Sequence, residues 1–134
     1  MSGDNDSYNG HDELTGLHDS VYFSLEFDRV KAILRRTGES KLLLYLHLHE
    51  ATPEDKVKDV AEYWQNAFNR TCRYEKKDYS FLALHKDASD PKSKEQEVLD
   101  ALVSTHPELI IRIDSIVVNG ASGSLDELAA ELAK

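Results

Sequence analysis

The stretch KLLLYLHL, residues 41–48, decides the fold class of this sequence. Its five residues from Leu42 to Leu46 are all apolar apart from one tyrosine hydroxyl, so neither face of the segment is polar. A short apolar run of this kind is typical of a strand that is buried on both faces, as in a parallel sheet. We therefore place a central strand at residues 41–48 and expect helices to cover both faces of its sheet.

Helical and extended patterns alternate on either side of this strand. The helices are expected at residues 24–38, at 54–70, from Ser93 to about residue 103, and from Ser124 onward; the strands are expected at 79–85, 109–113 and 116–118. Strand 79–85 is expected to lie parallel to strand 41–48, and the last two strands are expected to form an antiparallel hairpin that turns at Asp114-Ser115. This order predicts an α/β fold with a four-stranded mixed sheet and helices on both faces.

Local signals mark several helix ends. Ser24 is expected to cap the first helix, and Gly38 to end it. Thr52 and Pro53 are typical of an N-cap and a first helical position. Two pairs fit the capping-box pattern at the start of the third and last helices, namely Ser93 with Gln96 and Ser124 with Glu127.

Composition narrows the class of protein. The 134 residues include 16 basic and 25 acidic ones, for a net charge of −9, so binding to a phosphate backbone is not expected. No apolar run is long enough to span a membrane, and no signal peptide is visible. One cysteine, Cys72, forms no internal disulfide and favours a cytoplasmic location, with a nuclear or ER-peripheral place as alternatives.

The first twenty residues differ in composition from the rest. They hold five acidic and no basic residues, together with three of the six glycines. Too few apolar groups are present there to offset the entropy of ordering the segment. We expect a flexible acidic tail over residues 1–20 and one domain over 21–134.

Three histidines are candidate metal ligands. His47 and His49 share one face of a strand, and His85 ends the strand expected beside it in parallel. With Glu50 as a fourth ligand, they have the chemistry of a zinc site. The alternative is that these histidines cap strand ends and bond to loop carbonyls, and the sequence favours this alternative.

Cys72 and Trp64 each allow two interpretations. Arg70 and Arg73 flank Cys72 and would activate a thiol, whereas a structural thiol is the alternative. Trp64 has the spacing of a core residue, and an exposed contact residue is the alternative. The basic residues after helix 54–70 fit either an acidic partner or a solvated loop, namely Arg70, Arg73, Lys76 and Lys77.

A proline stands directly before the strand that leads into the last hairpin, in HPELII at residues 106–111. This stretch and the element order resemble the thioredoxin fold, which implies a cis bond before the proline. The redox site would then lie where strand 41–48 meets helix 54–70, but that place holds no cysteine, and disulfide exchange needs a thiolate. The resemblance implies a module without dithiol chemistry, whose candidate interaction residues are Ala51, Thr52, Pro53, Glu54, His106 and Pro107.

Three short stretches carry a narrower resemblance. VYFSLE at 21–26, KLLLYLH at 41–47 and SLDEL at 124–128 are similar to UAS domains, the thioredoxin-like modules of Fas-associated factors and other UBX-containing proteins. The resemblance implies a non-catalytic interaction module of a ubiquitin-pathway adaptor, with protein partners, no cofactor and a response to long-chain fatty acids. The alternatives are a metal-binding or single-thiol enzyme of thioredoxin-like fold and a thioredoxin-like chaperone.

Overall fold

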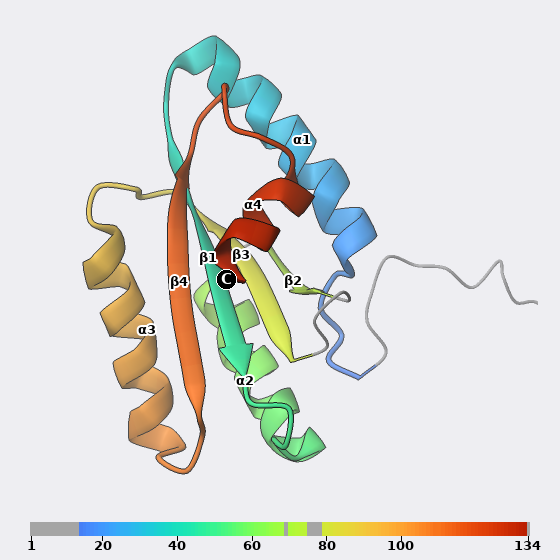
Figure 1. Cartoon of the computed structure of the whole chain (residues 1–134), viewed down its shortest axis with the longest axis vertical. Helices are drawn as coiled ribbons and strands as arrows, with labels where there is room; N and C mark the ends of the chain where they lie inside the picture. Colours follow the sequence, from blue (N-terminus) through green and yellow to red (C-terminus); the bar gives the residue numbers. More distant parts are fainter. Residues whose placement is uncertain (1–13, 69, 75–78, 134) are drawn as a thin grey trace, which may run out of the picture.

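The computed structural model describes residues 14–68, 70–74 and 79–133 of the chain. Its helices are α1 (Ser20–Thr37), α2 (Glu54–Ala67), α3 (Pro91–Thr105) and α4 (Leu125–Leu132), and its strands are β1 (Lys41–Leu48), β2 (Arg70–Tyr74), β3 (Ser80–His85) and β4 (Ile111–Val118). Figure 1 shows the sheet between its helices, with β1 in the interior. Within the described ranges, no helix has the length and apolar character that crossing a membrane requires.

The strands form one sheet in the order β2-β3-β1-β4, and every neighbouring pair is antiparallel. Leu42 of β1 lies opposite His85 of β3 on one side and opposite Val117 of β4 on the other. The predicted α/β class, with a four-stranded sheet and helices on both faces, is confirmed, but the predicted parallel pairing is wrong. Helix α2 returns the chain to β2, which runs in the same direction as β1. The chain then reverses, so β3 enters between them in the opposite direction.

The helices form one layer on each face of the sheet (Figure 1). Side chains alternate along β1, so Leu42 and Leu44 pack with α2 and α3, whereas Leu43 and Tyr45 pack with α1 and α4. Burial on both faces explains the continuous apolar run of β1. The segment from β1 to β4 has the β-α-β-β-α-β connectivity of ferredoxin-like folds, and α1 and α4 cover its other face.

This architecture corrects the thioredoxin-like prediction. A mixed sheet was expected, and all the pairings are antiparallel. The described residues contain no cis peptide bond, so the bond before Pro107 is trans and the implied cis-proline is wrong. Residues 111–118 form one strand rather than a hairpin. Asp114 and Ser115 lie inside it because β1 pairs with β4 along its whole length.

Several boundaries are confirmed or shifted. Gly38 ends α1 at a φ of 73°, as predicted, and the capping box of Ser124 and Glu127 opens α4, as predicted. Helix α1 begins earlier than expected because the Asp19 carboxylate accepts a hydrogen bond from the Tyr22 amide at 2.9 Å. Strand β2 occupies residues whose composition predicts a helix end and a polar turn.

The two other helix starts lie close to their predicted positions. Pro53, rather than Thr52, is the N-cap residue of α2. Helix α3 begins at Pro91 because the Asp90 side chain accepts a hydrogen bond from the Ser93 amide at 3.2 Å, so Ser93 is a helical residue and not the cap.

The chain before α1 packs against the sheet. Leu17 is 1% exposed and belongs to the core. His18 forms an isolated parallel bridge with Cys72, and its carbonyl accepts a hydrogen bond from the Arg73 amide at 3.0 Å. These residues fall in the stretch expected to be a tail; residues 1–13 of that stretch lie outside the described residues.

The loop between β4 and α4 lies against α1. A Cβ atom added at Gly120 would come within 2.6 Å of the Arg35 Cα, so only glycine fits this approach. Arg35 Nε also donates a hydrogen bond to the Gly120 carbonyl at 3.2 Å, and Lys31 Nζ donates one to the Gly123 carbonyl at 3.0 Å. The β4–α4 loop is therefore held against helix α1.

Candidate functional site

Two pockets lie at opposite ends of the sheet. The first, which we call the cationic pocket, has a volume of about 160 Å³ and is lined by Lys41, Ala67, Phe68, Arg70, Leu84, His85 and Lys86. The second, which we call the β1–β4 pocket, has a volume of about 310 Å³ and is lined by His47, His49, Glu50, Ile110, Ile111 and Arg112.

Strand ends bring the cations of the first pocket together. Lys41 is the first residue of β1, Arg70 is the first residue of β2, and Lys86 follows the last residue of β3. The register places Arg70 opposite Leu84, and His85 opposite Leu42. Within the described ranges, none of the three cations forms an ion pair. Three positive side chains therefore gather in one place on a chain of net charge −9. The Glu26 carboxylate acts on one of them: its hydrogen bond with Arg29 lowers its pKa, and Arg70 lowers it further without a direct ion pair.

Aromatic rings form one wall of the cationic pocket. The Phe68 ring meets the His85 imidazole edge to face at 5.7 Å, and it packs in the same manner on Trp64 at 4.8 Å. Trp64 is fully buried, as predicted, and its Nε1 donates a hydrogen bond to the Leu82 carbonyl at 2.9 Å. Burial lowers the pKa of His85 below its ordinary value, and the nearby Lys94 ammonium lowers it further. The imidazole is therefore neutral at neutral pH.

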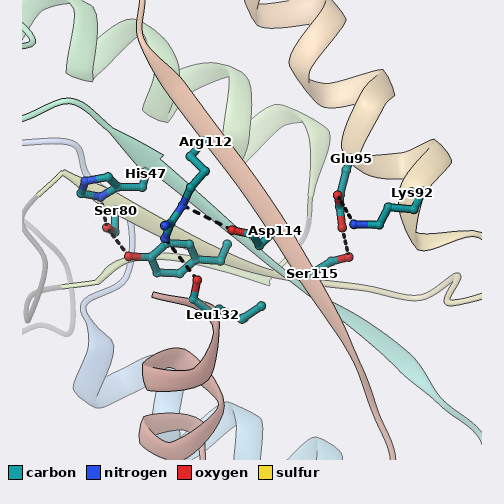
Figure 2. A network of polar contacts seen from close by, with 9 residues as sticks. His47, Ser80, Lys92, Glu95, Arg112, Asp114, Ser115 and Leu132 are labelled. Atoms are coloured by element: carbon teal, nitrogen blue, oxygen red, sulfur yellow. Dashed lines mark hydrogen bonds and ion pairs between the residues drawn. The ribbon is translucent and has the colours of Figure 1, made fainter. Parts of the chain in front are cut away.

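A buried polar chain leads to the β1–β4 pocket. Ser80 is fully buried on β3, and its Oγ lies 2.9 Å from the Tyr45 hydroxyl and 2.8 Å from His47 Nδ1 (Figure 2). Each of these groups gains a hydrogen-bond partner away from water, which burial requires. These two hydrogen bonds fix the orientation of the His47 ring at the mouth of the β1–β4 pocket.

Arg112 is the cation of the β1–β4 pocket, and its guanidinium is already occupied. Its Nε lies 3.3 Å from the Asp114 carboxylate, and its Nη2 donates to the Leu132 carbonyl at 3.1 Å (Figure 2). The guanidinium carbon also lies 5.7 Å from the centre of the Tyr45 ring. Most of its charge is therefore balanced within the chain.

The three predicted zinc ligands are not brought together. His47 lies opposite Ser80, whereas His85 lies opposite Leu42 near the other end of β1. The antiparallel direction of β3 separates them. In the described part of the chain, no group of three or more His, Cys, Asp or Glu side chains could hold a metal ion.

The predicted interaction residues lie in two loops at the same end of the sheet. Residues 51–53 join β1 to α2, whose first residue is Glu54, and His106 and Pro107 follow α3. Lys56 of α2 reaches Glu108 at 3.4 Å, and His106 Nδ1 lies 3.9 Å from the same carboxylate. Both loops are thus close together, and a protein contact there stays a prediction.

The remaining candidates separate by burial. Cys72 is fully buried in the core below α1, which agrees with the structural interpretation of this thiol. Lys76 and Lys77 lie outside the described residues. Sequence analysis picked out Arg70 but missed Lys41, Phe68 and Lys86. The signal in the sequence was a basic residue at one end of each of β1, β2 and β3. It could be interpreted as a pocket only once it was known which strand ends lie together.

Comparison with solved structures finds GGDEF domains. A sensory box/GGDEF family protein from Caulobacter crescentus has a TM-score of 0.73 and 14% identity, over 93% of this chain and 94% of its own. The GGDEF domain of DgcB from the same organism, in complex with c-di-GMP, has a TM-score of 0.72 and 14% identity, over 99% and 89%. The FimX GGDEF domain of Pseudomonas aeruginosa has a TM-score of 0.67 and 16% identity, over 94% and 90%.

Sequence comparison gives no further assignment. No family model matches the chain, and no curated protein matches it. The string Gly-Gly-Asp-Glu-Phe does not occur in the sequence, in which no two glycines are adjacent.

These neighbours overturn the UAS assignment and everything that depended on it. The predicted ubiquitin-pathway module, its ubiquitin-pathway partners, its fatty-acid response and the thioredoxin-like alternatives are wrong, because the structural neighbours are GGDEF domains. The expectation that the chain is not an enzyme is corrected by the same finding. It rested on a missing dithiol in a fold that the chain does not have. What the comparisons establish is that this chain has the fold of GGDEF domains.

Proposed function

We propose that this chain is a c-di-GMP-binding domain of GGDEF type and that the cationic pocket holds a phosphodiester of the ligand. One observation carries the assignment to this pocket: Lys41, Arg70 and Lys86 meet in it without an ion pair among the described residues. C-di-GMP carries two phosphodiester charges, and the DgcB domain with the same fold is in complex with it.

The side chains of the pocket suit both parts of such a ligand. A guanidinium forms two parallel hydrogen bonds to a phosphate, which suits Arg70, and Lys41 and Lys86 add charge. Phe68 and His85 offer aromatic surfaces on which a guanine base can stack. The volume of about 160 Å³ is below the usual range for a whole small-molecule ligand. One phosphodiester therefore sits in the pocket, and the rest of the dinucleotide extends over its rim.

The β1–β4 pocket is larger but less suited to a dianion. Its arginine is engaged by Asp114 and the Leu132 carbonyl, and Glu50 adds a negative charge to the lining. A dianion entering it would have to displace Asp114 from Arg112, which costs part of the binding energy. The charge balance therefore favours the cationic pocket.

Titration calorimetry of the full chain with c-di-GMP tests the proposal. Loss of one charge-assisted hydrogen bond costs about 1.5–3 kcal/mol, so Arg70→Gln is expected to weaken binding by roughly tenfold or more. Lys58→Gln removes the same charge from an exposed position on α2 and is expected to leave the Kd unchanged. Binding should also weaken as salt is added.

The outcomes separate the function from the site. If titration with c-di-GMP gives no saturable heat of binding, the proposed function is refuted. Binding that Arg70→Gln and Lys58→Gln leave equally strong would refute the pocket assignment. We also propose a cytoplasmic location, because the single cysteine of the chain is buried and has no second cysteine with which to form a disulfide within the chain.

A further inference from the structure

The outer edge of β4 differs from every other strand surface in the described structure. Strand β4 pairs only with β1, and all of its residues except Val118 are at least partly exposed. Ile110, just before the strand, is 67% exposed, and Val117 near its end is 42% exposed. In Figure 1, β4 lies in front of β1, with α3 on one side and α4 on the other.

The opposite edge of the sheet is paired at one position with the chain that precedes α1. Strand β2 receives the parallel bridge from His18 to Cys72, and the Arg73 amide donates to the His18 carbonyl. Among the described residues, no segment pairs in this way with the outer edge of β4. Unpaired edges invite another strand, and proteins usually guard them with charges or proline.

Strand β4 carries only two charges, and these are of opposite sign. Its sequence IRIDSIVV is rich in β-branched residues, which favour strand pairing. Arg112 and Asp114 stand on either side of Ile113. They point to the same face of the sheet because side chains alternate.

We propose that β4 pairs antiparallel with β4 of a second copy of this chain, centred on Ile113, to form one continuous eight-stranded sheet. A two-fold axis perpendicular to the sheet places a residue opposite itself at the centre. With Ile113 at the centre, Arg112 lies opposite Asp114 of the second copy, and the reverse pair forms as well. Opposite charges directly across a strand pair are stabilising. Each Arg112 can keep its own Asp114 at 3.3 Å while it faces Asp114 of the second copy, so the pairing does not require the contact within the chain to break.

Neighbouring registers are excluded by the same two charges. Centring the pair on Arg112 or on Asp114 would place that charge opposite its own copy, which is destabilising. The register centred on Ile113 also places the exposed Ile110 opposite Ile116 of the second copy and removes apolar surface from water. Arg112 and Asp114 would disfavour pairing with most other strands, but they are complementary to a second copy of β4 in this register.

The helix beside β4 leaves this edge open. Glu95 of α3 accepts a hydrogen bond from the Ser115 hydroxyl (Figure 2), so α3 is held on the face of the sheet that Ser115 shares with Ile113. Arg112 and Asp114 are on the other face, where they are partly exposed.

Disulfide trapping tests the register directly. In an antiparallel pair, the Cα atoms of residues opposite each other lie about 4.5–5.5 Å apart, within the range that a disulfide bridges. Ile113→Cys is therefore expected to form a covalent dimer under mild oxidation. Val117→Cys is the matched control, because four residues of offset in each copy separate the two thiols by about 27 Å. Cys72, the other cysteine, is buried.

Analytical ultracentrifugation of the full chain tests the charges. The unmodified chain is expected to show a concentration-dependent dimer. Asp114→Lys is expected to weaken association by about tenfold, because two attractive pairs become repulsive. Combining Arg112→Asp with Asp114→Arg restores opposite charges across the interface and should restore the dimer.

Circular dichroism of each variant shows whether it is folded. A chain that stays monomeric at all accessible concentrations would overturn the proposal. So would a dimer in which Ile113→Cys crosslinks no faster than Val117→Cys, because another surface would then be responsible.

Discussion

Replacing Gly120 by alanine tests the packing of the β4–α4 loop against α1. The added Cβ would lie 2.6 Å from the Cα and 2.8 Å from the backbone nitrogen of Arg35, whereas ordinary contacts begin at 3.4 Å. The loop must therefore retreat by about 0.8 Å from a helix backbone that cannot rotate away. Overpacking of this kind costs about 1–3 kcal/mol. The Arg35 hydrogen bond to the Gly120 carbonyl, 3.2 Å long, would be strained as well.

The assay is urea unfolding followed by circular dichroism and by the fluorescence of the single tryptophan, Trp64. We expect Gly120→Ala to lower the free energy of unfolding by about 2 kcal/mol, and the Tm by roughly 8 °C. Gly123→Ala is the comparison, because its Cβ would meet the Glu127 carboxylate, at 2.9 Å, instead of a backbone. Displacing that carboxylate costs only its capping-box hydrogen bond from the Ser124 amide, about 1 kcal/mol, so this variant should unfold at a higher midpoint than Gly120→Ala. If the two variants unfold at the same midpoint, the close approach of the loop to α1 does not exist and the reasoning fails.

Three further changes have expected outcomes. Trp64→Phe leaves the Leu82 carbonyl without its indole donor and opens a small cavity, so unfolding should become easier by about 2–4 kcal/mol, measured by denaturant titration. Because the pKa of His85 is lowered in the folded state, stability should fall as pH drops from about 7.5 to about 5.5; His85→Gln should flatten this slope, and an unchanged slope would exclude His85 as its cause. Ser124→Ala removes the N-cap acceptor of α4 and should cost about 1 kcal/mol; a Tm equal to that of the unmodified chain would contradict the capping role.

How much the sequence revealed depended on whether a signal was local. Gly38, the capping box at Ser124 and the buried Trp64 are set by residues close in the chain, and all three were predicted. No local signal in the sequence determined the direction of β3 relative to β1. Strand β1 is apolar on both faces because helices cover both faces, and this is equally true in a parallel and in an antiparallel sheet. Burial therefore predicted the layers correctly and the strand direction incorrectly.

Strand β2 and the cationic pocket were hidden for related reasons. In β2, Thr71, Cys72 and Tyr74 are buried, but the two arginines among them gave the segment the composition of a polar turn. Lys41 and Lys86 are far apart in the sequence and meet only because β1 and β3 are antiparallel neighbours. An error in one strand direction thus placed His85 at the wrong end of the sheet and suggested a metal site in place of the cationic pocket.

The packing of Leu17 in the core and the bridge from His18 to β2 have a practical consequence for any shortened form of this chain. A fragment that starts at Val21, where composition alone would place the domain boundary, lacks His18, which bridges to β2, and Leu17, which belongs to the core. Such a fragment would expose both margins of the sheet, and a unit that can be extended on two sides joins into open-ended filaments instead of closing as a pair. Expression trials should therefore retain the residues before α1. Precipitation of a trimmed fragment would reflect the missing contact of residues 17–18 with the sheet rather than an unstable core.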